Sequence, residues 1–424
     1  MKHMILTRSP IGNSHRMWRQ DNFILSTFSA RGENMRDVLE NCTDAGFTML
    51  ELGWASHEQA EEALRICEEL DIDLLFQDFS VFGGMQMHHM DRGPWNSDDA
   101  KAVADHVRPY KSCVGYYVWD EPYKDDQLTE ARRLVDLLQK EDPTRCPFTV
   151  AIPSYNDLFT WENGEFYAYL NRYVSIIDPP MLSLDYYPIG LPGYTDEKQL
   201  DDSLMWCDLG LMRHLCREHN MPLWFYYQGV NLFKYAHFEF PMVRMMMYAA
   251  AMYGAKALQQ YTCVDSVIDE KGQKSIFFDE TKAIHAEFKK LGNTLMALDS
   301  RYVFHSEDLL PGSPYITGLA DNITDSEVIC GTLQNRVSVG ELEDKYGNTY
   351  LVILNRDFTV DKTVELSMKK TSRIYEVSRE TGRQSVLEDT ADKLTVTLAP
   401  GDAMLIRVQD AAEEAYTVEY RLEK

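Results

Sequence analysis

Two hydrophobic patterns alternate along the first two thirds of the chain. Short runs of consecutive apolar and aromatic residues, typical of buried strands, are followed by stretches whose apolar residues recur at helical spacing. Eight strands are predicted from the runs: Phe23–Ser29, Phe47–Trp54, Ile72–Phe79, Val114–Trp119, Phe148–Ile152, Leu182–Tyr187, Leu223–Gln228 and Ala257–Tyr261. The helical stretches between them include Glu58–Leu70, Asp126–Lys140, Gln199–Glu218 and Pro241–Tyr253.

Eight strand–helix units predict an α/β fold, a closed (β/α)8 TIM barrel over residues 1–298. A doubly wound open sheet is the alternative, but that fold usually carries a Gly-rich phosphate turn after an early strand. No such turn is present in this sequence. The barrel is therefore the favoured architecture, and it is the domain in which we expect catalysis.

The pattern changes at Asp299. From there the apolar residues alternate with period two, and Gly, Asn and Asp punctuate the runs, as in the turn Tyr346-Gly347-Asn348. This is typical of short antiparallel strands, so we predict a small all-β sandwich domain over residues 299–424. The last segment, Tyr416–Leu422, alternates in the same way and is expected to add a strand to that sheet.

Composition narrows the classes of partner. The 424 residues carry a formal net charge of −25, which disfavours nucleic acid and anionic membrane as partners and favours a neutral substrate. Aromatic residues make up 12% of the chain, with 24 Tyr and 7 Trp, and rings of this kind stack on sugars. No N-terminal signal peptide and no apolar stretch of membrane-spanning length are visible. The eight cysteines form no Cys-x-x-Cys pair, so we expect reduced thiols and a cytoplasmic protein.

One strand ends in an unusual way. The buried run Val114–Trp119 is followed directly by Asp120, Glu121 and Pro122. Two adjacent carboxyls at the end of a buried strand repel each other and lose hydration, so at least one pKa should be raised. A raised pKa suits a general acid that works near neutral pH. Asp120 and Glu121 are therefore the leading catalytic candidates.

Active-site residues of (β/α)8 barrels lie at the carboxyl ends of the strands. Those ends in this sequence are rich in carboxylates, amides and aromatic rings, which can hydrogen-bond hydroxyl groups and stack on a sugar face. Besides Asp120 and Glu121, the predicted site contains Asp185 as a third catalytic candidate and, for substrate binding, Glu51, Trp54, Asp78, Trp119, Tyr186, Tyr187, Tyr227, Gln228 and Gln260. No metal or cofactor is expected, because the adjacent pair His88-His89 does not converge on one ion and no ligand spacing follows it.

These features together resemble the (β/α)8-barrel glycoside hydrolases that carry a C-terminal β-sandwich, a likeness that covers nearly the whole chain. In the large retaining clan of that family, the fourth strand ends in Asn-Glu-Pro and its Glu is the acid/base. Asp120-Glu121-Pro122 stands in that place, so the resemblance implies that Glu121 is the general acid/base of a glycosidase. The clan places a nucleophilic Glu at the end of strand seven, where this sequence has Gln228.

Since an amide cannot attack an anomeric carbon, three interpretations stay open. Another carboxylate, Asp185 first and then Asp265, Glu51 or Asp78, serves as the second catalytic group. Alternatively, Asp120 and Glu121 act as in the β-N-acetylhexosaminidases that use the acetamide group of the substrate, with Tyr187 or Tyr227 as a donor to the acetamide carbonyl. In the third interpretation, the protein is a carbohydrate-binding barrel that has lost its nucleophile. The first predicts hydrolysis of a neutral glycan or glycoside and is the favoured one; oligomeric state is not indicated.

Overall fold

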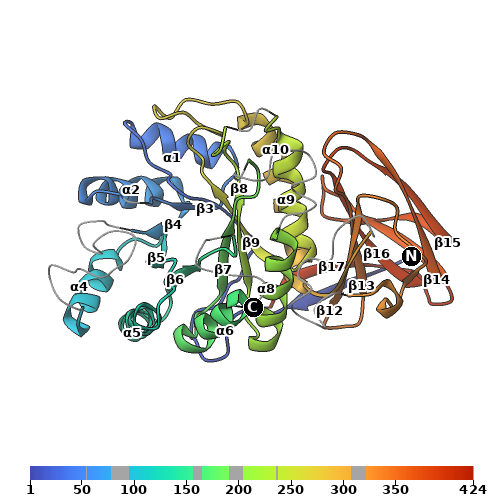
Figure 1. Cartoon of the computed structure of the whole chain (residues 1–424), viewed down its shortest axis with the longest axis horizontal. Coiled ribbons are helices and arrows are strands. Elements are labelled where there is room, and N and C mark those ends of the chain that lie inside the picture. Colours follow the sequence, from blue (N-terminus) through green and yellow to red (C-terminus); the bar gives the residue numbers. More distant parts are fainter. Residues whose placement is uncertain are drawn as a thin grey trace.

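Eight parallel strands close into a barrel, as predicted (Figure 1). The computed structural model describes residues 1–53, 55–77, 95–155, 165–190, 204–234, 237–306 and 321–423. The barrel strands are β2 (Ile24–Thr27), β3 (Met49–Glu51), β4 (Asp73–Phe76), β5 (Cys113–Asp120), β6 (Cys146–Ala151), β7 (Leu182–Tyr186), β8 (Leu223–Gln228) and β9 (Ala255–Tyr261). Pairing of β9 with β2 completes the ring. Each observed strand overlaps one predicted run, so the fold prediction is confirmed.

Helices surround the barrel because each buries one apolar face against the strands. Within the described residues they are α1 (Met35–Asp44), α2 (His57–Leu70), α4 (Ser97–Val107), α5 (Asp125–Glu141), α6 (Glu165–Ile177), α8 (Met205–His219), α9 (Phe240–Met252) and α10 (Phe278–Ala297). The start of α2 shows how local sequence fixes an element. Ser56 Oγ accepts from the backbone N–H of Gln59, and Gln59 Oε1 accepts from the backbone N–H of Ser56. This reciprocal pair is a capping box, which fixes the start of the helix.

The barrel interior is a packed apolar core that is closed at the amino-terminal end of the strands. Trp224 on β8 packs edge-on against Trp18, with ring centroids 5.9 Å apart. The indole Nε1 of Trp224 donates to the Oε1 of Gln20 at 2.8 Å. The segment before β2 therefore plugs this end of the barrel, and a substrate must enter from the carboxyl end.

An antiparallel sheet follows the barrel, which confirms the second predicted architecture. Its order is β10 (Leu298–His305), β12 (Val337–Asp344), β13 (Thr349–Asn355), β16 (Ala403–Asp410), β14 (Lys362–Val377) and β11 (Ile329–Cys330), with β15 (Gln384–Leu398) paired to β14. A short 3-10 helix, η2 (Ile323–Asp325), precedes β11.

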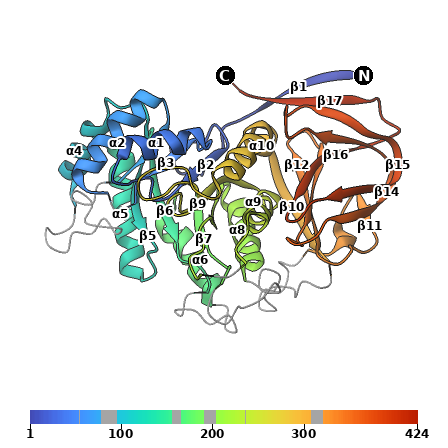
Figure 2. The same ribbon diagram turned by 90° about the horizontal axis from the view of Figure 1, so that it is seen from above.

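The final strand does not extend this sheet, contrary to expectation. β17 (Tyr416–Leu422) pairs in parallel with β1 (Lys2–Arg8), and the two form a separate two-stranded ribbon. Figure 2 shows the ribbon running beside the sheet, with both chain termini next to it. The first eight residues thus lie with the C-terminal sheet rather than with the barrel strands.

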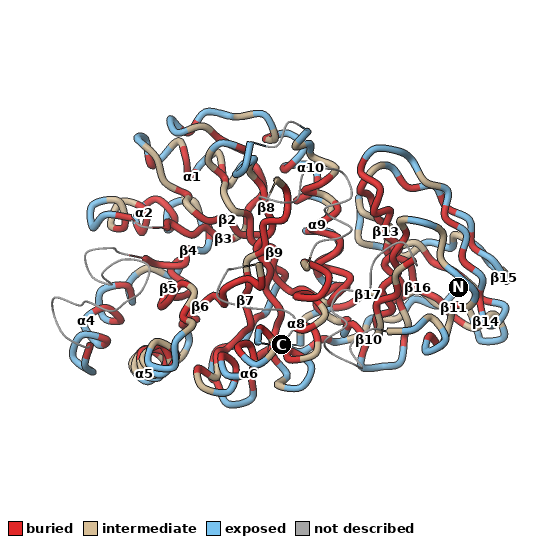
Figure 3. The backbone as a smooth tube through the Cα atoms, in the orientation of Figure 1, coloured by how far each residue is buried: buried red, intermediate tan, exposed pale blue. Residues whose placement is uncertain are grey.

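Helix α9 joins the two parts of the molecule. It contacts β8 and β9 on one side and β12 and β13 on the other, which explains why ten of its residues, including Met245, Met246 and Met247, are buried. Figure 3 shows burial continuing from the barrel strands through α9 into the sheet. The C-terminal domain approaches α9 closely at Gly401, where a Cβ atom would lie 2.1 Å from the carbonyl oxygen of Pro241.

Other sequence predictions concern thiols and membranes. All eight cysteines are free, and seven of them are buried. A search of the described residues finds no helix with the length and apolar character needed to cross a membrane.

Candidate active site

The strand-end turn after β5 brings two neighbouring carboxyls to one side of the chain. Successive side chains of a strand point to opposite faces, so Asp120 and Glu121 would normally diverge. Glu121 instead adopts a left-handed conformation with φ of 53°, which is rare for a residue other than glycine and is found at functional sites. As a result, both side chains line the same cavity.

This cavity lies at the carboxyl end of the barrel strands and has a volume of about 280 Å³. Three carboxyl groups converge in it, from Asp120, Glu121 and Asp185. The remaining lining residues are mostly aromatic: Phe28, Tyr117, Val150, Tyr155, Tyr187, Tyr226 and Tyr261. Rings of Phe28 and Tyr261 are stacked at 5.7 Å, and the ring of Tyr187 lies 4.7 Å from that of Tyr261. The site therefore combines proton-transfer groups with ring faces and phenol hydroxyls.

Burial raises the pKa values of all three carboxyls, and repulsion between charges adds to the shift for Asp120 and Asp185. Burial, followed by the charge of Glu121, raises the pKa of Asp120 to about 8, although the phenol of Tyr117 donates to its Oδ1 at 3.0 Å. Burial also raises the pKa of Glu121, an effect opposed by a hydrogen bond with Asp185. Burial and then the charges of Glu121 and Asp120 raise the pKa of Asp185 well above its usual range. Two carboxyls can hydrogen-bond each other only when one of them carries a proton, so the interaction between Glu121 and Asp185 favours a singly protonated pair.

A fourth carboxyl, that of Glu51, lies beneath the cavity and is completely buried. It accepts hydrogen bonds from Ser26 Oγ at 2.5 Å and from Gln259 Nε2 at 2.9 Å. The third donor is the hydroxyl of Tyr226, a residue that lines the cavity. Burial raises the pKa of Glu51, and the three donors oppose that shift. Glu51 thus acts on the cavity through Tyr226 and does not line it directly.

Four of the predicted binding residues point away from the cavity. Trp119, Tyr186 and Tyr227 pack in the large core cluster that includes the helices. The phenol of Tyr227 donates to Gln260 Oε1 at 3.0 Å, and Gln260 Nε2 in turn donates to Ser266 Oγ at 2.8 Å. Consecutive residues at a strand end alternate between the two faces of the strand. A prediction that takes every residue at a strand end therefore includes side chains that point away from the barrel interior. Trp54 and Asp78, with His88 and His89, lie outside the described residues.

Gln228 occupies the strand-seven position of the clan nucleophile, but its side chain is hydrogen-bonded to the backbone of two loops. Its Oε1 accepts from the backbone N–H of Ile189 at 2.8 Å, and its Nε2 donates to the carbonyls of Ile189 and Val230 at 3.0 and 3.1 Å. The side chain is completely buried and does not line the cavity. Gln228 joins two loops at the carboxyl end of the barrel.

Several lining residues were missed by the sequence reasoning. Tyr117 and Tyr226 precede the strand ends and point into the barrel, whereas Tyr155 and Phe28 follow β6 and β2. Period-two alternation could have found Tyr226, because it shares a strand face with Trp224 and Gln228. It could not have found Tyr117 and Asp120 together, because the pairing of β5 with β6 shifts register between Tyr117 and Trp119.

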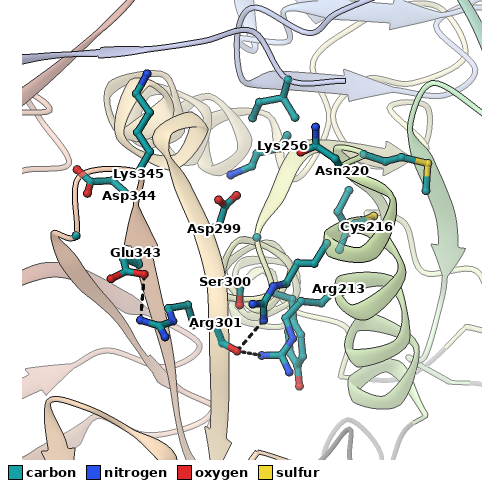
Figure 4. A pocket seen from close by; sticks show the side chains of 17 residues that line it. Arg213, Cys216, Asn220, Lys256, Asp299, Ser300, Arg301, Glu343, Asp344 and Lys345 are labelled. Carbon is teal, nitrogen blue, oxygen red and sulfur yellow. Dashed lines mark hydrogen bonds and ion pairs between the residues drawn. The ribbon is translucent and has the colours of Figure 1, made fainter. Parts of the chain in front are cut away.

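A larger cavity of about 610 Å³ lies between α8, the amino-terminal ends of β8 and β9, and the C-terminal sheet (Figure 4). Two of its arginines form ion pairs within the protein. Arg301 pairs with Glu343 at 3.0 Å, and Arg213 pairs with Asp321 at 2.5 Å. It lies at the opposite end of the strands from the carboxyl cluster, so it is not the candidate active site. Among the described residues, no group of three or more His, Cys, Asp or Glu side chains is placed to hold a metal ion.

Comparisons with known proteins support the fold. No protein-family model and no curated protein sequence matches the chain. Among solved structures, a GH42 β-galactosidase from G. stearothermophilus is similar with a TM-score of 0.57 and 9% identity, over 95% of this chain and 99% of the other. A β-galactosidase from Rahnella sp. is similar with a TM-score of 0.53 and 9% identity, over 95% and 100%. The chain therefore shares the two-part architecture of glycoside hydrolases.

Proposed function

We propose that this protein is a glycoside hydrolase in which Glu121 is the general acid/base. The observation that carries the proposal is the convergence of Asp120, Glu121 and Asp185 in a ring-lined cavity at the carboxyl end of the barrel. General acids are tuned by burial so that they hold a proton near neutral pH, and burial shifts the pKa of Glu121 in that direction. The fold shared with β-galactosidases supports the same reaction class.

In this mechanism Glu121 protonates the glycosidic oxygen as the bond to the anomeric carbon breaks, and later removes a proton from the attacking water. The rings of Tyr187 and Tyr261 offer a stacking surface for the sugar, and the neighbouring phenols offer hydrogen bonds to its hydroxyl groups. We assign a neutral glycoside as the substrate class, because a negative charge on the substrate would be repelled by the carboxyls of the cavity.

Asp185 is proposed to keep the shared proton available to Glu121. The carboxyls of a retaining pair lie about 5–5.5 Å apart and those of an inverting pair about 6.5–9.5 Å apart, so that the second distance leaves room for water. The pKa values of Glu121 and Asp185 depend on each other, through a hydrogen bond that lowers the first and a charge that raises the second. This interaction favours proton sharing, as between paired aspartates.

Assistance by a substrate acetamide is the second candidate, and the Tyr117–Asp120 contact favours it. The hydrogen bond at 3.0 Å fixes the Asp120 carboxyl beside Glu121, where it could orient an acetamide nitrogen. The mechanism would require turnover of 2-acetamido glycosides alone. It would also require that Asp120→Asn lower that rate by roughly 10²–10⁴-fold.

The test is a paired panel of aryl glycosides, plain hexosides and their 2-acetamido counterparts in both anomeric forms, with wild type and Glu121→Gln. We expect turnover by the wild type and a loss of roughly 10²–10⁴-fold in kcat in the variant, while its circular dichroism and Tm stay native. A variant with a near-normal rate would remove Glu121 from the mechanism. No turnover of any glycoside would leave the carbohydrate-binding interpretation, to be tested by calorimetric titration with oligosaccharides.

A further inference from the structure

The position of the missing nucleophile is the starting point. In β8, the residues Trp224, Tyr226 and Gln228 alternate onto one face of the strand. Gln228 is bonded to three backbone groups and does not line the cavity. Tyr226 is the preceding residue on the same face, and its side chain does line the cavity with Asp120, Glu121 and Asp185. The seventh barrel strand therefore presents a phenol to the cavity, two residues before the position at which its carboxylate would be expected.

The phenol of Tyr226 is hydrogen-bonded to the carboxyl of Glu51, which has no role in the mechanism described so far. Glu51 is completely buried, and no cation pairs with it in the part of the chain that the structure describes. Its oxygens accept from Ser26, Gln259 and Tyr226. The orientation of Gln259 is fixed, because its own Oε1 accepts from Ser183 Oγ at 2.8 Å. The three donors favour the ionised form of Glu51, whereas its burial and the nearby carboxyl of Asp120 favour the uptake of a proton, so Glu51 is suited to act as a base.

From this arrangement we infer that Tyr226 is the nucleophile of the proposed glycosidase and that Glu51 is the base that takes its proton. The inference rests on the proposed function. A nucleophile hydrogen-bonded to a base that is itself held by further groups is the general arrangement of covalent catalysis. A tyrosine nucleophile is an accepted departure from the two-carboxylate scheme of glycoside hydrolysis. The burial that raises the pKa of Glu51 strengthens it as a proton acceptor, and burial also raises the pKa of Tyr226, so the phenol gives up its proton only as its oxygen bonds to the anomeric carbon.

The chemistry balances without any further reactant. In the first step, Tyr226 Oη bonds to the anomeric carbon as the bond to the leaving oxygen breaks; Glu51 takes the phenol proton, and Glu121 gives its proton to the leaving oxygen. In the second step, the oxygen of a water molecule bonds to the anomeric carbon and the bond to Tyr226 breaks. Glu121 takes a proton from that water, and Glu51 returns the proton to Tyr226. Two displacements give a product with retained configuration.

The test traps the covalent intermediate in the wild-type protein. The probe is a 2,4-dinitrophenyl 2-deoxy-2-fluoro glycoside of the sugar and anomer that the wild type hydrolyses, and the labelled peptide is located by mass spectrometry. We expect retention of configuration and a label on Tyr226. A label on Asp185, Asp120 or Glu121, or an inverted product, would overturn the inference and leave the proposed function intact. Retention of configuration on 2-acetamido substrates alone, with no labelled peptide, would also overturn the inference and leave the proposed function intact. Absence of any glycoside turnover would instead reject the proposed function, and the inference with it.

Variants give an independent test. Tyr226→Phe and Glu51→Gln should each lower kcat by at least about 10³-fold. Tyr173→Phe is the matched control, because Tyr173 is also a buried tyrosine whose phenol donates a hydrogen bond, to Thr149 Oγ1 at 2.6 Å, and it belongs to helix α6. It should keep wild-type kcat. A folded Tyr226→Phe protein with wild-type kcat would contradict the inference.

Discussion

At the scale of single residues, the site depends on where individual carboxyls are held and how far they lose water. Because the backbone at Glu121 is left-handed, the adjacent carboxyls of Asp120 and Glu121 both point into the same cavity. Burial then makes both of them weaker acids. A sequence can show which polar residues follow a buried strand, and on that basis Asp120, Glu121, Asp185 and Tyr187 were assigned to the strand ends; all four line the cavity. It cannot show the interaction between Glu121 and Asp185, because that interaction depends on how the ends of β5 and β7 are placed in the closed barrel.

The raised pKa of Asp120 predicts how stability changes with pH. Its pKa is about 8 in the folded protein and about 4 when unfolded. Between these values the folded state binds more protons, so the contribution of Asp120 to the free energy of unfolding falls as pH rises from 4 to 8. Asp120→Asn removes this titration, and its amide oxygen can still accept from Tyr117. The difference in Tm, variant minus wild type, should therefore increase between pH 5 and pH 8 in thermal unfolding. A difference that does not change with pH would contradict the assignment.

At the scale of strands and helices, runs of consecutive apolar residues and helical patterns were sufficient to place all eight barrel strands, because the strands of a parallel barrel are buried on both faces. The patterns failed where a strand departs from regular geometry. The register shift in β5 and the alternation at the strand ends put Trp119, Tyr186, Tyr227 and Gln260 outside the cavity. The pairing of β1 with β17 was also missed, because it joins opposite ends of the chain and nothing local specifies it.

Gln228 provides a prediction for the end of β8. Gln228→Glu would restore the residue type expected of the clan nucleophile, but its carboxylate would face the carbonyl oxygens of Ile189 and Val230. We expect a loss of about 3 kcal/mol in the free energy of unfolding at pH 7 and no gain of activity. Protonation would let the new side chain donate to one carbonyl, so the loss should be smaller at pH 4. Urea unfolding at both pH values measures this; a fully stable, more active variant would show that Gln228 faces the substrate.

At the scale of the whole molecule, the sheet is fastened to the barrel by polar contacts as well as by α9. Asp402 accepts from Arg244 Nε at 2.8 Å and from Arg379 Nη1 at 2.7 Å, and Glu287 accepts from Arg244 at 2.7 Å. The network links α9 and α10 to the turn before β16. The sequence indicated the order of the two architectures, but a long-range ion network of this kind has no sequence signature.

Removing the shared acceptor should loosen the junction. Asp402→Ala leaves two arginines with one carboxylate, and we expect a loss of about 2–3 kcal/mol in the free energy of unfolding. Glu365→Ala, which breaks the exposed pair with Lys393, is the control and should lose less than about 1 kcal/mol. Calorimetry would compare the two variants. Equal losses would show that the network does not fasten the sheet to the barrel.

The central claim, that Glu121 protonates the leaving group, is tested most directly by leaving-group dependence. The measurement is kcat/KM, which reports cleavage of the bond to the leaving group and not the later attack of water, for wild type and Glu121→Gln on one sugar with a series of aryl leaving groups, from phenol to 2,4-dinitrophenol. Without its acid, the variant should lose roughly 10²–10⁴-fold on the phenyl glycoside. It should lose far less on the dinitrophenyl glycoside, whose leaving group needs no proton. An equal loss across the series would contradict the account, because Glu121 would then act on something other than the departing oxygen.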